Sequence, residues 1–162
     1  MNMKKVWKKV EKVNWTNNYF EWHEVGRGFD NDGSISHIFI NYTKPISKNT
    51  FDEDINRVVH STVCTINLDI DFYEHDDDTQ LEISYELSVK RLGGGFEQYI
   101  NSFNAVEPKD LIKTLKQDID NIVTWLDAYD AMLTDGNFKE TDEERIIEFA
   151  NRLSDKLEKD DE

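Results

Sequence analysis

The acidic side chains between residues 69 and 86 are the groups in this sequence whose type and spacing best support a chemical role. Two segments, 63–73 and 80–92, alternate apolar and polar residues, and a polar loop joins them. Alternate residues of a strand lie on one face, about 6.5–7 Å apart, so carboxylates at that spacing can bind a row of positive charges. The candidate partner-binding residues are Asp69, Asp71, Asp76, Asp77, Asp78, Glu82 and Glu86.

The kind of partner follows from a comparison with nucleic acid. Successive phosphates of duplex DNA lie about 3.4 Å apart along the axis of each strand, so alternate carboxylates of a β-strand match every second phosphate. A rigid protein with such a surface could compete with nucleic acid for a groove lined by Lys and Arg, with fast and salt-sensitive association. The alternative interpretation is an ordinary solvated surface whose charge keeps the protein soluble.

The histidines and the cysteine form no recognisable catalytic or metal-binding motif. His23, His37, His60 and His75 show no HxxxH or HExxH spacing, and a single cysteine cannot anchor a thiolate site. Cys64 lies four residues from His60, but it falls on the apolar face of its segment, where cysteine behaves as a small hydrophobic residue. The sequence therefore predicts no catalytic residues, no metal and no cofactor.

The glycine-containing motifs are predicted to be turns. Asp30–Gly33 contains acids of a calcium-binding loop, but the ligand positions that would complete it hold Gly28 and Phe39. Its Asp-Gly step instead favours a tight β-hairpin turn. Gly26–Gly28 and Gly93–Gly95 lack the Lys-Ser/Thr of a phosphate-binding loop, so turns are predicted there as well.

The net charge of −15 is unevenly distributed. Residues 50–90 carry 11 acids against two bases, and residues 107–162 carry 17 acids against eight bases. Such an excess repels nucleic acid and anionic membranes and attracts basic protein surfaces. The lone cysteine, the lack of an apolar run of about 18 residues and the lack of an apolar signal segment predict a cytoplasmic protein.

The basic segment 1–13 carries five Lys against one Glu. Its apolar residues recur at helical spacing with lysines on the other side, which predicts a short amphipathic helix. We expect this helix to dock on the protein's own acidic surface or on that of a second copy. Contact with nucleic acid or an anionic membrane is the alternative.

Strands and one further helix are predicted before residue 63. Segments 19–25 and 35–42 are rich in aromatic and β-branched residues and flank the predicted turn, which indicates a hairpin that Pro45 ends. Thr50 and Glu53 fit a capping box, which predicts a short helix over 51–60; an extended strand is the alternative.

The two alternating segments are predicted to pair as antiparallel strands. A register that aligns both faces places Asp71 opposite Glu82 and Asp69 opposite Ser84. Its apolar pairs are Phe72–Leu81, Ile70–Ile83, Leu68–Tyr85, Ile66–Leu87 and Cys64–Val89. A one-residue slip would bring acids into the core, so the assignment of faces is strongly specified.

The C-terminal third is predicted to be mainly helical. A further strand is expected over 96–103, followed by a long amphipathic helix from Pro108 to about Gly136 and a last helix opened by the capping box at 141–144. The predicted fold is one α+β domain over 1–162. It has an antiparallel sheet of about five strands, packed on one face by two C-terminal helices (107–162), and a short N-terminal helix.

In type, the chain is similar to acidic inhibitors, some of them DNA mimics, that block restriction or CRISPR nucleases and are encoded by phages or mobile elements. We therefore predict a non-enzymatic inhibitor, monomeric or homodimeric, that binds the basic surface of a nucleic-acid-binding protein. One alternative is an interaction module that binds through an aromatic N-terminal surface, Trp7, Trp15, Tyr19 and Trp22. A small enzyme with His23 or His60 next to a carboxylate is the third hypothesis.

Overall fold

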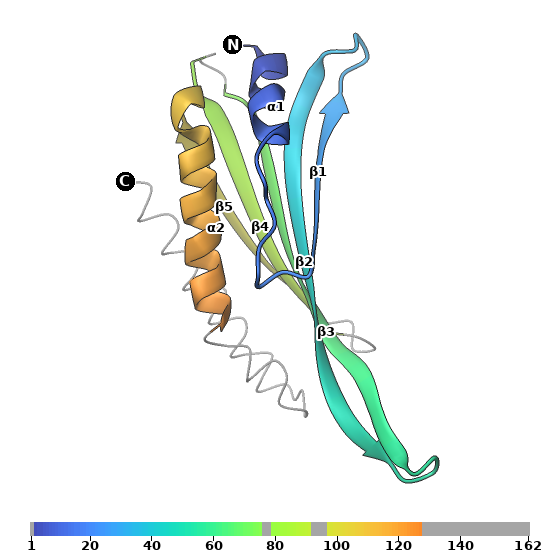
Figure 1. The fold of residues 1–162 in the computed structure, drawn as a ribbon. Helices are drawn as coiled ribbons and strands as arrows, with labels where there is room; N and C mark the ends of the chain where they lie inside the picture. The colour runs from blue at the N-terminus through green and yellow to red at the C-terminus, as the bar shows by residue number, and fades with distance from the viewer. Residues whose placement is uncertain (1, 76–78, 92–96, 128–162) are drawn as a thin grey trace.

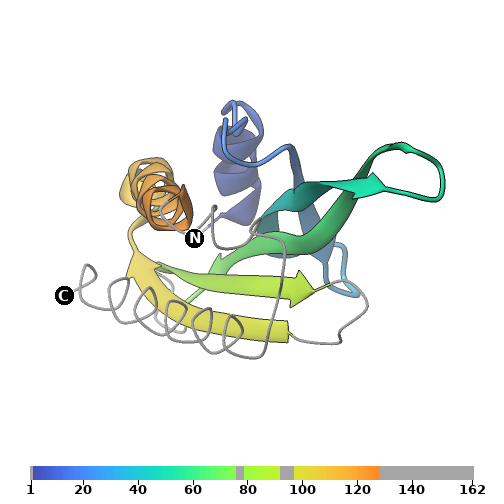
Figure 2. The same cartoon turned by 90° about the horizontal axis from the view of Figure 1, so that it is seen from below.

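The computed structural model describes residues 2–75, 79–91 and 97–127. Five antiparallel strands pair in chain order as one sheet, and both described helices lie on the same face of it (Figures 1 and 2). The elements are α1 (Met3–Glu11), β1 (Trp22–Phe29), β2 (Ile35–Asp52), β3 (Arg57–Glu74), β4 (Leu81–Arg91), β5 (Glu97–Val106), the short 3-10 helix η1 (Pro108–Asp110) and α2 (Leu111–Asp127). The predicted α+β class, five-stranded sheet and N-terminal helix are confirmed. One C-terminal helix is described, and the last helix expected after residue 141 lies outside the described residues.

A single hydrophobic core joins the sheet to the two helices. Alternation along β2, β3 and β4 places every second side chain on the helix-facing side of the sheet. On α2, Leu111, Leu115, Ile119, Ile122 and Leu126 recur every three or four residues and are buried against that side. Buried strand residues on that side include Ile38, Ile40, Tyr42, Ile66, Leu68, Ile70, Phe72, Leu81, Ile83, Tyr85 and Leu87.

The N-terminal helix packs on this core through its apolar side. Met3, Val6 and Val10 are buried, and the lysines of α1 are exposed on its other side. Asn2 caps the helix, since its side-chain oxygen accepts a hydrogen bond from the backbone N–H of Lys4 (3.0 Å). Within the described part of the chain, neither helix has the length of apolar sequence that crossing a membrane requires.

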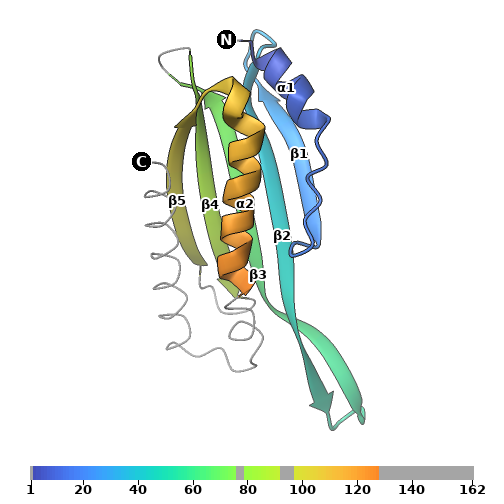
Figure 3. The same cartoon turned by 60° about the vertical axis from the view of Figure 1, so that its left-hand side comes forward.

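Two buried hydrogen bonds fix the linker between α1 and β1. The Trp15 indole N–H donates to the carbonyl of Val10 (2.9 Å), and the Tyr42 hydroxyl donates to the carbonyl of Trp15 (2.7 Å). Each ring therefore contributes apolar area to the core while its polar atom satisfies a backbone carbonyl. This linker holds α1 over the β1–β2 half of the sheet (Figure 3).

The pairing of β3 with β4 keeps the predicted faces but corrects the predicted register. Asp69 lies opposite Glu86, Asp71 opposite Ser84 and Tyr73 opposite Glu82, a displacement of two residues. The connecting loop spans 75–80 instead of the predicted 74–79, and the backbone N–H of His75 donates to the carbonyl of Gln80 (2.9 Å). A two-residue shift leaves every side chain on its original face, so alternation alone cannot detect it.

The helix predicted over 51–60 is wrong, and the alternative of an extended strand is confirmed. The structure pairs β2 with β3 as far as Asp52 and Arg57, with a turn at 53–56. The Asp52 carboxylate accepts a hydrogen bond from the Asp54 N–H (3.0 Å), and Asn56 adopts a left-handed φ of 53°. Both features favour a tight turn over a helix start.

The paired segments 47–52 and 57–62 extend beyond the rest of the sheet as a two-stranded arm (Figures 1 and 3). Pro45 therefore does not end β2, contrary to prediction. The last partner pair of β1 with β2 is Trp22–Thr43, so one edge of β2 is free at Pro45. Proline is tolerated at such an edge because no neighbouring strand needs its missing N–H.

The turn predicted at Asp30–Gly33 is confirmed, but Gly26 and Gly28 lie inside β1 rather than in a turn. Gly33 has a φ of 85° and donates to the carbonyl of Asp30 (2.9 Å). A Cβ atom on Gly26 would stand 2.3 Å from the ring of Phe39, and one on Gly28 would stand 2.2 Å from that of His37. The rings of Phe39 and His37 on β2 therefore lie over the backbone of β1, in the space that a side chain at Gly26 or Gly28 would fill.

The register generates a testable prediction. Glu86→Lys should raise the free energy of unfolding by about 0.2–1 kcal/mol, because it places an opposite charge directly across from Asp69. In an Asp69→Asn background, Glu86→Lys should no longer raise the free energy of unfolding. Any increase from Glu82→Lys, which lies opposite Tyr73, should be the same with or without Asp69→Asn. Urea denaturation of the single and double variants measures the coupling. The observed register would be contradicted if the effect of Ser84→Lys on unfolding free energy, and not that of Glu86→Lys, depended on Asp69.

Candidate binding surface on the open face of the sheet

The face of the sheet opposite α1 and α2 carries four of the predicted acidic residues, and we call it the open face because neither described helix lies on it. Figure 2 shows both helices on the other side of the sheet. Because their neighbours along each strand are core residues, Asp69 and Asp71 of β3 and Glu82 and Glu86 of β4 lie on the open face, partly buried. The structure thus brings four of the seven predicted residues together on two adjacent strands. Asp76, Asp77 and Asp78 lie outside the described residues.

The strand pairing aligns four of the polar residues into one row across the sheet. Glu24, Asn41, Asp69 and Glu86 occupy successive register positions on β1, β2, β3 and β4. We call these four residues the acidic row. Directly opposed side chains of antiparallel strands have Cβ atoms about 4.5–5.5 Å apart, so three carboxylates and one amide are held close together.

The electrostatics of Asp69 are unfavourable to its charged form. Burial raises the pKa of Asp69, and the nearby charges of Glu86 and Asp71 raise it further. With its amide nitrogen towards β3, Asn41 donates a hydrogen bond to Asp69 Oδ1 (3.1 Å). Burial also raises the pKa of Asp71, while the positive charge of His37 opposes that shift.

Within the described part of the chain, Lys and Arg side chains do not neutralise these carboxylates. No Lys or Arg there forms an ion pair with Asp69, Asp71, Glu82 or Glu86. Lys90 lies on the same face, four residues along β4 from Glu86, or about 13 Å at the rise of a β-strand. The acidic row therefore has a negative field that a positively charged partner would reduce.

Aromatic rings lie beside the acidic row on β2. The rings of His37 and Phe39 lie 6.1 Å apart across the glycines of β1, and Phe39 is opposite Asp71. Trp22, on the same face of β1, is 53% exposed. This aromatic strip was not predicted from the sequence, because Gly26 and Gly28 were interpreted as turn residues.

The aromatic N-terminal surface considered from the sequence is not a continuous surface. Trp15 and Tyr19 are buried in the core, with exposed fractions of 4% and 7%. Trp7 is half-buried beneath Arg27, whose guanidinium carbon stands 4.7 Å from the indole centroid. Trp22 is exposed but lies on the open face. Two of the four rings therefore stabilise the core and are not accessible to a partner.

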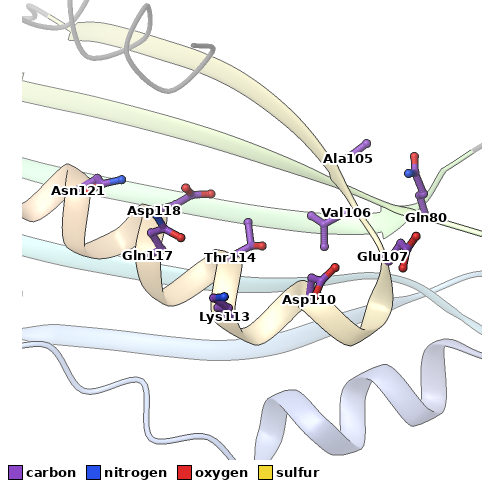
Figure 4. A pocket seen from close by; sticks show the side chains of 10 residues that line it. All are labelled: Gln80, Ala105, Val106, Glu107, Asp110, Lys113, Thr114, Gln117, Asp118 and Asn121. Carbon is purple, nitrogen blue, oxygen red and sulfur yellow. The ribbon is translucent and has the colours of Figure 1, made fainter. Parts of the chain in front are cut away.

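A polar cavity of about 460 Å³ lies between α2 and the end of β5 (Figure 4). Its lining includes Glu107, Asp110, Lys113 and Asp118 but no histidine. Asp118 is 6% exposed and accepts a hydrogen bond from the Tyr85 hydroxyl. Asp118 was not among the residues predicted from the sequence, although it follows the buried helix position Leu115 at the spacing of the apolar stripe.

The cavity offers no recognisable catalytic arrangement. His23 lies on β1 with its ring 6.0 Å from that of Tyr42, and the side chain of His60 lies outside the described part of the structure. Among the residues described, no group of three or more His, Cys, Asp and Glu side chains could hold a metal ion. Among the described residues, the acidic row places several carboxylates on one surface of adjacent strands, where they can bind a positively charged ligand together.

Comparison of the chain with protein-family models, curated proteins and solved structures finds no match. The class defined here is therefore structural: an α+β protein in which a five-stranded antiparallel meander carries helices on one face and carboxylates on the other.

The pKa of Asp69 predicts a pH-dependent effect of Asp69→Asn. A raised pKa in the folded state means that the contribution of Asp69 to stability is complete below its unfolded pKa, about 3.9, and is lost as the pH rises through the folded value. At pH 7, Asp69→Asn should therefore raise the free energy of unfolding by roughly 0.2–1 kcal/mol. Thermal melts from pH 3 to 7 should show the gain disappearing towards pH 3.

Asp32→Asn is the matched control with the opposite sign. Hydrogen bonds from Ser34 lower the pKa of Asp32, so its contribution to stability is present at neutral pH and is lost as the pH falls. This variant should be less stable than the parent at pH 7 and should approach it in acid. Equal pH profiles for the two variants would contradict the assignment.

Proposed function

We propose that this protein is a non-enzymatic inhibitor that places the carboxylates of its open face in the basic groove of a nucleic-acid-binding protein. The single observation that supports the proposal is the position of Asp69, Asp71, Glu82 and Glu86. They share one face on adjacent strands, opposite both described helices, and form no ion pair with a described Lys or Arg.

The geometry of a sheet suits mimicry of a phosphate array. Asp69 and Asp71 are alternate residues of β3, about 6.5–7 Å apart, and Asp69 and Glu86 are neighbours across strands that lie about 4.8 Å apart. These positions are fixed by backbone pairing on both sides of β3 and β4. A preorganised array loses little conformational entropy on binding, which favours a tight complex.

The energetics of the acidic row favour a cationic partner. Asp69 is partly desolvated and next to other negative charges, so a Lys or Arg from a partner would relieve repulsion as well as form charge-assisted hydrogen bonds. Binding should lower the pKa of Asp69, and affinity should therefore rise as the pH increases through the raised pKa of the free protein. Long-range attraction would make association fast at low salt.

The target class is an enzyme that holds DNA or RNA in a Lys- and Arg-lined groove. A nuclease of a bacterial restriction or CRISPR system fits this description, and the inhibitor would then be phage-encoded and act in the host cytoplasm. Such a target presents a row of cations at the spacing of phosphates, which the open face can occupy in place of the nucleic acid.

Charge reversal tests the proposal. The variant Asp69→Lys, Asp71→Lys, Glu82→Lys is compared with Asp110→Lys, Asp120→Lys, Asp127→Lys, which makes the same charge change at exposed positions on η1 and α2. Each tagged protein is used as bait in a bacterial lysate, with graded salt and duplex DNA as competitor. The parent and the η1/α2 variant should capture a protein that duplex DNA releases. The open-face variant should bind it at least tenfold more weakly, a loss of about 1.4 kcal/mol.

Three results would contradict the proposal. The first is a folded open-face variant that retains the target, and the second is an equal loss in both variants, which would indicate that only net charge matters. The third is binding that duplex DNA does not displace and that survives about 0.5 M NaCl, where screening is severe. Circular dichroism and thermal melts establish that each variant is folded.

A further inference from the structure

Exposed apolar side chains gather on two surfaces away from the acidic row. Among the described residues, five large hydrophobic side chains are exposed, and four of them lie on these two surfaces. Phe51, Ile55 and Val58 lie at the end of the β2–β3 arm, and Phe29 lies beside α1. Apolar clusters of this kind mark interaction sites on soluble proteins.

The arm tip, defined as residues 51–58, combines apolar and acidic groups. Phe51 is paired directly with Val58 across the arm, so their side chains share one face, with exposed fractions of 56% and 62%. Ile55 in the turn is 48% exposed. The charged residues of the tip are three acids and one base: Asp52, Glu53, Asp54 and Arg57.

The α1 groove has the complementary composition. It is a cavity of about 290 Å³ between α1 and the β1–β2 hairpin, with Trp7, Phe29 and Ile35 as its apolar lining. Arg27 lies over both aromatic rings, 4.7 Å from the Trp7 centroid and 5.2 Å from the Phe29 centroid. Its charged lining residues are three bases and one acid: Lys4, Lys8, Arg27 and Glu11.

We infer that the arm tip of one copy of this protein binds the α1 groove of a second copy. Three apolar side chains on the tip face three in the groove, and an excess of two negative charges on the tip faces an excess of two positive charges in the groove. The apolar contact removes exposed surface from water, and the charges set the partner's orientation.

The positions of the two surfaces favour a closed dimer. The arm tip and the α1 groove lie at opposite ends of the long axis of the molecule, so a tip cannot reach the groove of its own chain (Figure 1). Two copies in antiparallel orientation bring each tip to the other's groove, and a two-fold axis then makes the contact twice. The inference does not rest on the proposed function, because it uses none of the acidic row.

Two electrostatic effects oppose this dimer. Each chain carries a net charge of −15, but repulsion between charges farther apart than about 8 Å is largely screened at physiological salt. The second effect comes from Asp30 and Asp32, whose negative charges lie in the turn next to the groove. The Ser34 hydroxyl donates hydrogen bonds to both carboxylates (3.4 and 2.6 Å).

A charge exchange between the two surfaces tests the inference. Variant T carries Glu53→Lys and Asp54→Lys on the tip, and variant G carries Lys4→Glu and Lys8→Glu in the groove. Sedimentation velocity at about 100 μM, where a micromolar contact is largely occupied, should show a dimer for the parent and monomers for T and for G. An equimolar mixture of T and G should again form a dimer, since both of its tip–groove contacts join opposite charges.

The control variant Asp120→Lys, Asp127→Lys makes the same charge change as T on exposed positions of α2, and it should remain dimeric. Phe51→Ser with Val58→Ser should weaken the parent dimer at least tenfold while the variant stays folded by circular dichroism, because both side chains are exposed. A monomeric parent, a dimer that T and G leave intact, or a mixture that stays monomeric would each overturn the inference.

Discussion

Strict alternation of apolar and polar residues along β3 and β4 is the constraint on which the rest of the structure depends. Ile66, Leu68, Ile70 and Phe72 are fully buried, so the residues between them must lie on the opposite face. A shift of the strand by one residue would bury Asp69 and Asp71 under α2, at a cost that far exceeds any gain from new contacts. The apolar residues of these two strands therefore determine where the negative charges lie.

This division of faces creates an imbalance between the two sides of the sheet. The helix-facing side is a continuous core in which polar atoms such as the Tyr42 hydroxyl and the Trp15 indole N–H have hydrogen-bond partners. On the open face, Asp69 and Glu86 are neighbours of like charge, and burial raises the pKa of Asp69. Groups that weaken the free protein but strengthen a complex are typical of binding surfaces, where stability and activity oppose each other.

The sequence was sufficient to predict which face each residue of β3 and β4 occupies, because that property depends only on a period of two. It was not sufficient to predict their register, since displacements by two residues preserve the faces and the turn after Glu74 decides between them. The capping pattern at Thr50 and Glu53 predicted a helix that the pairing of β2 with β3 overrides.

Other features depend on contacts between residues that are distant in the sequence. The roles of Gly26 and Gly28 follow from rings that β2 places over β1, and no local pattern shows this. The carboxyl group of Asp118 is satisfied by Tyr85, 33 residues earlier in the chain. The position of Asp118 within the apolar stripe of α2 was visible in the sequence, and a helical projection of residues 111–126 would have identified it as buried.

The order of the strands has a consequence for how the chain folds during synthesis. Each strand pairs with its neighbour in sequence, so hairpins can form one after another as the chain leaves the ribosome, and few long loops must close. The helix that covers β3 and β4, however, is made after all five strands. Until residues 111–126 emerge, the apolar side of those strands lacks that cover, and a nascent chain halted there would be prone to aggregate.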